Sequence, residues 1–475
     1  MWGAAGFTGE NAALRYPGVA SKHPWPGGAC LPDRPCRISP SMNPPETPAG
    51  SVTRVVVASF IGTMIEWYDF FLYGTAAALV FNQVFFPTLD PLAGTMASFA
   101  TYAVGFFARP VGGIVFGHFG DRMGRKSMLV TTLMLMGLAT FLIGVLPTYR
   151  QIGVAAPVLL VLLRFIQGFG VGGEWGGAVL MAVEHGHAGR RGFYASWVQA
   201  GVPAGLLLAT AVFELFSLLP ESAFLSWGWR VPFLLGIALL GVGLFIRLQV
   251  FESPLFAKMR DAKQQRGVPF FEVLRRYPRN VLLAMGARFA ENGSFYVFTV
   301  FVLTYATTEL GVARTAILNG VLVASALQFF VIPAFGILSD RVGRRPVYLG
   351  GAAALAVFAF PFFWMVDTGS PTWIGLAIVI GLFVHAAMYA PQAAFFSELF
   401  GTDVRYTGAS IGYQLASPLA GGLAPLISMA LLQKSGGQPW PIAVYLIILA
   451  AITLVSVWLA AETHRASLGD HDSTP

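Results

Sequence analysis

The feature that most constrains this chain is a series of long apolar segments separated by short polar intervals. Each segment has about 20 residues or more, which is enough for a helix to cross a hydrocarbon core roughly 30 Å thick. With 56% hydrophobic and only 11% charged residues, the chain could not cover its apolar surface in water. The sequence therefore predicts an all-α membrane protein with twelve spans, near 54–81, 92–117, 127–147, 152–183, 192–219, 230–251, 280–308, 313–338, 346–366, 371–398, 403–433 and 439–461.

The residues before the first span have a different composition. Residues 1–50 contain nine prolines and no long apolar run, which indicates a disordered N-terminal tail and no signal peptide. Both cysteines, Cys30 and Cys36, lie in this tail, so they provide no disulfide framework. No His/Cys group has the spacing of metal ligands, and we expect neither a metal nor any other cofactor.

Lysine and arginine in the short loops predict the orientation in the membrane. Sixteen basic residues follow the even-numbered spans and four follow the odd-numbered ones. This asymmetry predicts that both termini lie in the cytoplasm, and we expect the protein in the inner (cytoplasmic) membrane. The first set is Arg122, Arg125, Lys126, Arg190, Arg191, Lys258, Arg260, Lys263, Arg266, Arg275, Arg276, Arg279, Arg341, Arg344, Arg345 and Arg405. The second set is Arg150, Arg230, Arg314 and Lys434. Because the net charge of +7 is explained in this way, it does not indicate nucleic-acid binding.

An internal repeat divides the chain into two halves. The segment "GHFGDRMGRK" after span 2 is matched by "GILSDRVGRR" after span 8, and Asp121 and Asp340 are 219 positions apart. Glutamate followed seven residues later by arginine also occurs twice, with an offset of 214. A duplicated six-helix unit explains both offsets, and parallel repeats of this kind are a transporter architecture. We expect an N-terminal bundle over 51–251, a cytoplasmic linker over 252–279, a C-terminal bundle over 280–462 and a tail over 463–475.

These segments carry a family resemblance over roughly 52–462. The pattern G-x-x-x-D-R-x-G-R-R/K after spans 2 and 8 resembles the signature of the major facilitator superfamily, and "RFIQGFGVGG" in span 4 resembles its second signature. The segments "IEWYDFFLYGTAAALVFNQVFFP", "GGEWGGA", "FLSWGWRVPF", "ENGSFYVFTVFVLTYAT" and "FGTDVRYTGASIGYQLASPLAGGLAP" resemble its metabolite:proton symporter family. That family includes carriers of shikimate, 2-oxoglutarate, citrate and proline or betaine. The resemblance implies the major facilitator fold and leaves the substrate open.

The repeated loop motif predicts a latch between the two halves on the cytoplasmic side. A carboxylate at the end of span 2 can face the N-terminus of a neighbouring helix, which the resemblance identifies as span 11, and the motif arginines can pair with acids at the ends of spans 4 and 10. Simple positive-inside anchoring would require neither an aspartate nor glycines at fixed spacing. The predicted gating residues are Gly117, Asp121, Arg122, Gly124, Arg125, Gly336, Asp340, Arg341, Gly343, Arg344, Glu184, Glu398 and Arg405.

Ionisable residues inside the spans are costly and are candidates for function. Glu66 and Asp69 lie three residues apart on span 1, with Glu66 roughly 18 Å deep, and two acids on one helical face favour proton uptake. Permanent cations cannot carry the proton, but they can bind a substrate carboxylate or act as switchable partners for the acids. The predicted substrate and proton-coupling residues are Glu66, Asp69, Arg109, Arg164, Glu174, Arg288 and Glu291, and buried structural salt bridges are the alternative for all of them.

Polar and aromatic residues at mid-span are candidates for lining a substrate cavity. Most of the aromatic residues would fill helix interfaces in any case, although a few could form a cation–π site for a quaternary ammonium ligand. His385 could equally be a packed, hydrogen-bonded core histidine. The candidate residues are Trp67, Tyr73, Trp175, Gln199, Asn292, Tyr296, His385, Gln392, Tyr413 and Gln414.

These observations predict a secondary active transporter that functions as a monomer and takes up a small organic acid with a proton by alternating access. Uptake of a zwitterion such as proline or betaine is the alternative. Drug efflux is less favoured, because "QAGVPAG" in span 5 only partly resembles the antiporter motif. An enzyme or receptor is disfavoured, since the sequence shows no nucleophile–base constellation, nucleotide loop or soluble domain, and "GFGVGG" does not follow a strand.

Overall fold

The computed structural model describes residues 49–89, 91–248, 269–401 and 404–465, and every regular element within these ranges is helical. The predicted disorder of the tail concerns residues 1–48, which lie outside the described residues, as does most of the predicted linker. Residues 49 and 50 already belong to the first helix, so that helix begins before the predicted start at residue 54.

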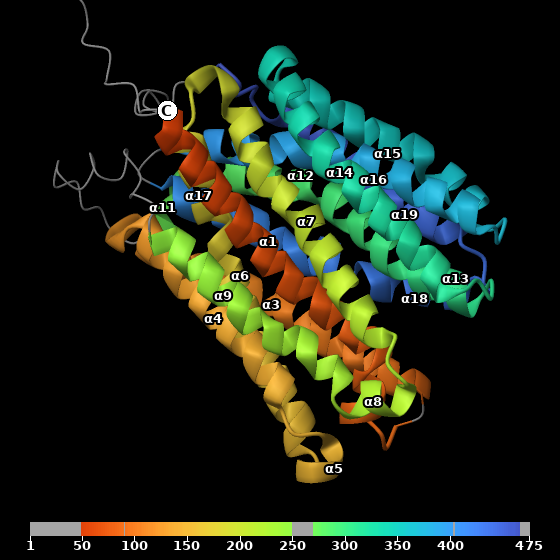
Figure 1. The fold of residues 1–475 in the computed structure, drawn as a ribbon. Helices are drawn as coiled ribbons and strands as arrows, with labels where there is room; N and C mark the ends of the chain where they lie inside the picture. Colours follow the sequence, from red (N-terminus) through yellow and green to blue (C-terminus); the bar gives the residue numbers. More distant parts are fainter. Residues whose placement is uncertain (1–48, 90, 249–268, 402–403, 466–475) are drawn as a thin grey trace, which may run out of the picture. The chain divides into compact units, whose positions relative to one another are not determined.

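The described N-terminal half consists of six long helices and three short α-helices in its loops, arranged as Figure 1 shows. The long helices correspond in order to predicted spans 1 to 6. They are α1 (Ala49–Leu79), α3 (Pro91–Met123), α4 (Arg125–Val145), α6 (Ala155–His185), α7 (Arg191–Ser217) and α9 (Val231–Leu248), and the short loop helices include α5 (Tyr149–Ile152) and α8 (Glu221–Ser226).

The C-terminal half repeats this plan, but two of its spans contain π-helical turns. Span 7 runs from Pro278 to Thr308 through α12, a π turn and α13, and span 11 runs from Arg405 to Lys434 through α17, a π turn and α18. The elements are α11 (Pro269–Arg276), α12 (Pro278–Tyr296), α13 (Val302–Thr308), α14 (Arg314–Val342), α15 (Arg344–Val366), α16 (Pro371–Glu398), α17 (Arg405–Ala416), α18 (Ala424–Lys434) and α19 (Trp440–Leu459), with π turns η3 (Val297–Phe301) and η4 (Ser417–Gly422).

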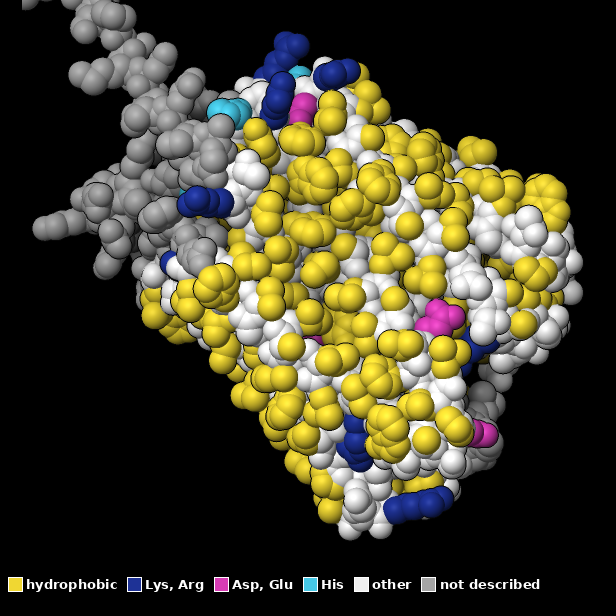
Figure 2. All heavy atoms as spheres, viewed as in Figure 1, with side chains coloured by type: hydrophobic (Ala, Val, Ile, Leu, Met, Phe, Trp, Pro, Cys, Tyr) yellow, Lys and Arg dark blue, Asp and Glu magenta, His cyan; other side chains and the backbone are white. Residues whose placement is uncertain are grey.

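Eleven of the described helices are long and apolar enough to cross a membrane. The remaining predicted span, span 7, carries the buried Arg288 and Glu291 on α12, which lowers its hydropathy although its helical path is complete. Hydrophobic side chains dominate the molecular face in Figure 2, and most of the lysine and arginine side chains visible there lie toward its ends. This distribution is that of a protein whose sides face lipid.

Small residues bring α3 and α6 into backbone contact. A Cβ atom on Gly168 would lie 2.1 Å from the carbonyl oxygen of Gly105, and one on Gly172 would lie 2.1 Å from that of Arg109. Close approach of this kind is how helices associate in lipid, where hydrophobic burial provides no driving force between them. It also fixes Arg109 on α3 against α6, in the middle of the N-terminal half.

Candidate functional site

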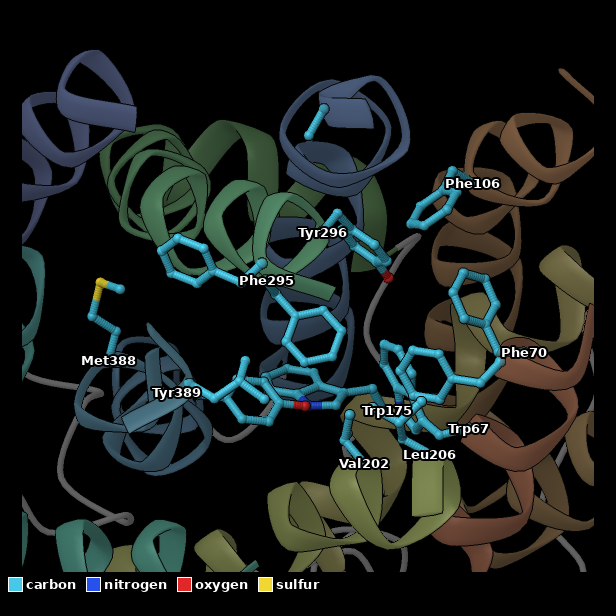
Figure 3. Close-up of a cluster of buried hydrophobic side chains, with 14 of the residues drawn as sticks. Trp67, Phe70, Phe106, Trp175, Val202, Leu206, Phe295, Tyr296, Met388 and Tyr389 are labelled. Carbon is cyan, nitrogen blue, oxygen red and sulfur yellow. The ribbon is translucent and has the colours of Figure 1, made fainter. Parts of the chain in front are cut away.

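A small pocket lies where the two halves meet. The N-terminal half contributes Trp67 from α1 and Val202 from α7 to its lining. The C-terminal half contributes Arg288, Glu291, Asn292, Phe295 and Tyr296 from α12, His385 and Tyr389 from α16, and Tyr413 from α17. Figure 3 shows aromatic side chains of both halves converging here, so the surroundings are apolar apart from a few placed polar groups.

The polar groups of the C-terminal half form one closed network. Arg288 donates to Glu291 at 2.9 Å and to Gln392 at 3.1 Å, and the Gln392 amide donates to Glu291 at 3.1 Å. His385 Nε2 lies 3.2 Å from the second Glu291 oxygen, while its Nδ1 lies 2.8 Å from the amide nitrogen of Gln328. His385 therefore bridges Gln328 and Glu291 through its two ring nitrogens.

Trp175, Gln199 and Gln414 connect the two halves beside this pocket. Trp175 stacks on Tyr413 with ring centroids 3.7 Å apart, and its indole N–H donates to Gln199 at 2.8 Å. Gln199 in turn donates to the backbone carbonyl of Tyr389 at 3.1 Å, and Gln414 donates to that of Gly172 at 3.2 Å. These three residues therefore lie at the interface between α6, α7, α16 and α17.

Arg109 and Arg164 are buried, each only 1% exposed, and neither lies within ion-pair distance of a described carboxylate. The Arg109 guanidinium lies over Phe70 and Phe106 at 4.4 and 4.6 Å, and over the pocket residue Trp67 at 5.6 Å. Its Nε and Nη2 atoms have no hydrogen-bond partner among the described residues.

Arg164 lies farther along the same half, in an aromatic cage. It lies over Tyr73, Phe70 and Tyr102 at 4.3 to 4.8 Å and donates to Gln167 at 2.6 Å. Tyr73 therefore contacts this arginine and is not part of the pocket lining.

Glu66 and Asp69 are buried inside the N-terminal half and do not line the pocket between the halves. Glu66 lies within electrostatic range of Arg109, Glu174 and Arg247. Asp69 lies beside Gly236 of α9 and Thr140 of α4, since a Cβ atom on Gly236 would contact both side chains. One oxygen of each carboxylate, Glu66 Oε2 and Asp69 Oδ1, has no hydrogen-bond partner among the described residues.

Glu174 forms a buried ion pair with Arg247 of α9. Arg247 also donates to the backbone carbonyl of Leu129, and Thr132 donates to Glu174 at 3.3 Å. Arg247 is not among the predicted site residues. Its position four residues before the predicted end of span 6 could have revealed it as an intramembrane charge.

One end of the bundle carries Lys126, Arg191, Arg344 and Arg405, and we call it the basic end. Asp340 connects the two halves at this end. Its carboxylate accepts the backbone N–H groups of Gly192 and Phe193, at 2.8 and 2.9 Å, where α7 begins. Arg344 holds the same carboxylate at 2.7 Å. The motif is helical up to Val342, and only Gly343, with φ of 107°, breaks the helix.

Glu398 forms ion pairs with two arginines at this junction. It pairs with Arg344 at 3.2 Å and, across the halves, with Arg191 at 3.7 Å. It also accepts from Thr463 at 2.7 Å, so residue 463, which the sequence assigns to the tail, belongs to the cluster. Next to it, Glu462 accepts the first backbone N–H groups of α15; although burial opposes ionisation, these bonds hold the pKa of Glu462 below its ordinary value.

The N-terminal repeat has a corresponding junction. Glu184 pairs across the halves with Arg405 at 3.6 Å. Gly117 lies inside α3 and lets α17 approach, since a Cβ there would lie 3.2 Å from the Thr407 Cα, and Gly124 has φ of 112° where the helix breaks. The side chains of Asp121, Arg122 and Arg125 lie outside the described residues, and Arg341 is exposed.

The opposite end is hollow between the halves. Two adjoining cavities, of about 70 and 300 Å³, share Thr75, Thr210, Arg314 and Leu318, and so are lined by both halves. The described structure is therefore closed at the basic end and hollowed at the other.

Comparison with known proteins assigns the family. The model of the Major Facilitator Superfamily matches residues 59–411 and 285–473. The shikimate transporter of Escherichia coli K12 is 43% identical over 87% of this chain and 95% of its own length, and the proline/betaine transporter of the same organism is 35% identical over 88% and 85%. A structure of the proton:xylose symporter XylE has the same fold, with a TM-score of 0.69, 17% identity and coverage of 88% of this chain and 98% of that one. The chain thus belongs to the metabolite symporters of the major facilitator superfamily and is a secondary transporter of the membrane.

Proposed function

We propose that this protein is a proton-coupled symporter that takes up a small organic acid, as a monomer, by alternating access. The observation that carries the proposal is the Arg109 guanidinium, which is buried beside the pocket between the halves without a carboxylate partner. A guanidinium in this position would be costly without an anion, and a substrate carboxylate matches its planar pair of donors.

The other buried arginines are weaker candidates for the carboxylate. Arg288 lines the pocket, but Ser417 accepts from its Nε, and Glu291 and Gln392 accept from its Nη1. Arg164 lacks an acid partner, but its cage of aromatic rings separates it from the pocket lining. The 43% identity to a transporter of shikimate, which carries a carboxylate, supports the same substrate class.

Proton coupling is assigned to Glu66 and Asp69. The C-terminal acid Glu291 is balanced by Arg288 and His385, whereas each of the two N-terminal acids has an oxygen without a hydrogen-bond partner. A buried carboxyl group without a fixed cation is the group that gains most from binding a proton.

The orientation follows from the loops. The basic end carries most of the loop lysines and arginines, so we assign it to the cytoplasm together with both termini. In this orientation the described state is closed to the cytoplasm and hollowed toward the outside, which is the arrangement that would admit a substrate for uptake.

The test is uptake of labelled shikimate into proteoliposomes under an imposed proton gradient, combined with equilibrium binding of shikimate. Arg109→Lys and Arg109→Gln should both lose binding, because lysine keeps the charge but not the planar pair of donors. Arg164→Lys is the matched control, since it changes a second buried arginine that has no acid partner. Wild-type affinity in both Arg109 variants would contradict the carboxylate assignment.

Zwitterion uptake is the second candidate, and the aromatic residues of the pocket favour it. Trp67, Tyr296 and Tyr413 line the pocket and could surround a quaternary ammonium group. The 35% identity to a proline/betaine transporter supports the same possibility. Binding of glycine betaine in place of shikimate, with Tyr413→Leu weakening it more than Arg109→Lys, would favour this substrate class.

A further inference from the structure

We infer that the proton reaches the cytoplasm by a route of its own through the N-terminal half, along one face of α1, separate from the pocket between the halves. This inference rests on the proposed proton coupling. The route leads to a second pocket at the basic end, lined by Ala58 and Ser59 of α1, Lys126 and Leu129 of α4, Met181 of α6, and Arg247 of α9.

The route follows a single stripe of α1. Ser59, Gly62, Glu66 and Asp69 are spaced three or four residues apart, which places them on one face of the helix. Contacts locate each level of this stripe. Ser59 lines the pocket, the Arg247 guanidinium packs directly on Gly62, and Asp69 lies beside Gly236 of α9. Glu66 lies one turn from Gly62 and hence next to the Arg247–Glu174 pair.

The other face of α1 belongs to the substrate pocket. Trp67 lines the pocket between the halves, and Phe71 lines the cavity at the opposite end. Phe70, one turn after Glu66, packs on Phe106 and Tyr296. The aromatic residues of α1 thus separate the substrate pocket from the two acids, which lie on the inner face of the helix.

The pocket at the basic end is built to receive a proton. Its cavity volume of about 20 Å³ is enough for about one water molecule, and Arg247 forms part of its wall. Lys126 lies in its lining and donates to the backbone carbonyl of Leu248 at 2.8 Å. The Arg247–Glu174 pair lies between this space and Glu66, so any proton that passes must pass this pair.

Arg247 is the group that can respond when Glu66 loses its proton. The charged groups that face Glu66 are Arg109 of α3, Glu174 of α6, Arg247 of α9 and Asp69 on α1 itself, with Lys126 of α4 at the pocket. The α7 residues next to this part of α1, Gly201 and Gly205, carry no charge.

The proton step is a simple transfer. The Glu66 carboxylic acid releases its proton to water in the pocket, and the resulting carboxylate shares Arg247 with Glu174. The guanidinium has five N–H donors, so it can bind a second carboxylate without losing the first. Reprotonation of Glu66 from the outer side returns Arg247 to Glu174 alone.

The first experiment needs no substrate. Lys126→Cys is introduced into full-length protein carrying Cys30→Ser and Cys36→Ser, which replace the only natural cysteines, and is then modified with neutral N-ethylmaleimide. Hydrogen–deuterium exchange of the Glu66 carboxylic acid is followed by infrared spectroscopy, using the carbonyl band that Glu66→Gln removes. We expect modification at residue 126 to slow this exchange.

Two matched positions serve as controls. Ser127→Cys is exposed on the same helix but outside the pocket, and Asn292→Cys lies in the pocket between the halves. Modification of either should leave the exchange rate of Glu66 unchanged. The proposal would be wrong if modification at residue 292 slowed the exchange and modification at residue 126 did not. Equal exchange rates in all three modified proteins would also overturn it. So would the absence of a Glu66 carboxylic acid band at every pH at which the protein stays folded.

A second readout uses labelled shikimate. Modification at residue 126 should abolish proton-driven net uptake but leave the exchange of internal for external shikimate intact, because exchange needs no net proton movement. If a protonophore does not reduce shikimate uptake by the unmodified protein, the proposed proton coupling is wrong. The infrared experiment tests the route of the Glu66 proton independently of that result.

Discussion

The closure at the basic end predicts a defined effect of Asp340→Asn. Asp340 of α14 accepts two N–H groups at the start of α7, so these bonds exist only while the halves are closed on this side. Its pair with Arg344 lies within the C-terminal half and persists in both states. Only the bonds to Gly192 and Phe193 therefore enter the balance between the closed and open states.

The magnitude follows from the geometry of these bonds. Asparagine keeps one acceptor oxygen, so the variant loses one hydrogen bond and the negative charge at the N-terminus of α7. A hydrogen bond to a charged group contributes about 1.5–3 kcal/mol and a charge at a helix terminus up to about 1 kcal/mol. The Asp340 side chain is only 8% exposed, so solvent screening is small. A loss of about 3 kcal/mol would lower the closed-to-open ratio about a hundredfold.

The assay is the labelling rate of Ser196→Cys by N-ethylmaleimide in the background lacking Cys30 and Cys36. Ser196 is fully buried on α7 against Gly336 of α14, so it becomes reachable only when the halves separate at the basic end. Asp340→Asn should accelerate labelling by up to the same factor of about a hundred.

The control is Asp367→Asn, which makes the same chemical change inside one half. Asp367 accepts from Tyr305 at 2.8 Å, and both residues belong to the C-terminal half, so labelling should stay at the background rate. A labelling rate of Asp340→Asn equal to that background would refute the idea that these bonds hold the cytoplasmic side closed. Simple positive-inside anchoring would then remain as the role of the motif.

The topology, the proton site and the C-terminal segment give further tests. A cysteine at Pro87 should react with an impermeant maleimide in intact cells, and labelling only after permeabilisation would contradict the assigned orientation. Glu66→Gln should abolish proton-driven accumulation of shikimate while its exchange continues, whereas full accumulation would exclude Glu66 as the proton site. Glu462→Gln should lower stability by about 1 kcal/mol near neutral pH, as loss of a helix cap does. Because the pKa of Glu462 is depressed in the folded protein, its contribution is present above the ordinary glutamate range and lost as pH falls through the folded value, so the difference in melting temperature should shrink in acid.

The path of the helices could be predicted from the sequence because hydrophobic length alone dictates it. In lipid every backbone polar group must be satisfied within the span, so each apolar run becomes a helix. Span 7 comes closest to the limit of this reasoning, since Arg288 and Glu291 lower its hydropathy. The π turns at Val297–Phe301 and Ser417–Gly422 have no periodic signal and could not be predicted.

The direction in which a buried charge points could not be predicted from depth alone. Glu66 and Trp67 are adjacent in sequence and equally deep, yet one faces the inside of the N-terminal half and the other the pocket between the halves. Helical spacing groups Glu66 with Asp69, but it does not say which neighbouring helix lies on that side. The partner of Glu174, Arg247 on α9, depends on the same tertiary packing.

The repeated glutamate and arginine pairs show why a sequence repeat can conceal a contact. Glu184 and Arg191 are seven residues apart, as are Glu398 and Arg405, and each pair joins the end of one helix to the start of the next. In the closed state the partners are exchanged: Glu184 binds Arg405 and Glu398 binds Arg191, each across the halves. Because duplication gives both halves one acid and one arginine at this level, neither half carries an excess charge when these contacts break. A buried charge left without a partner is costly. Pairs balanced within each half therefore let the cytoplasmic side open and close with a small net electrostatic cost, as a transporter that alternates between two states requires.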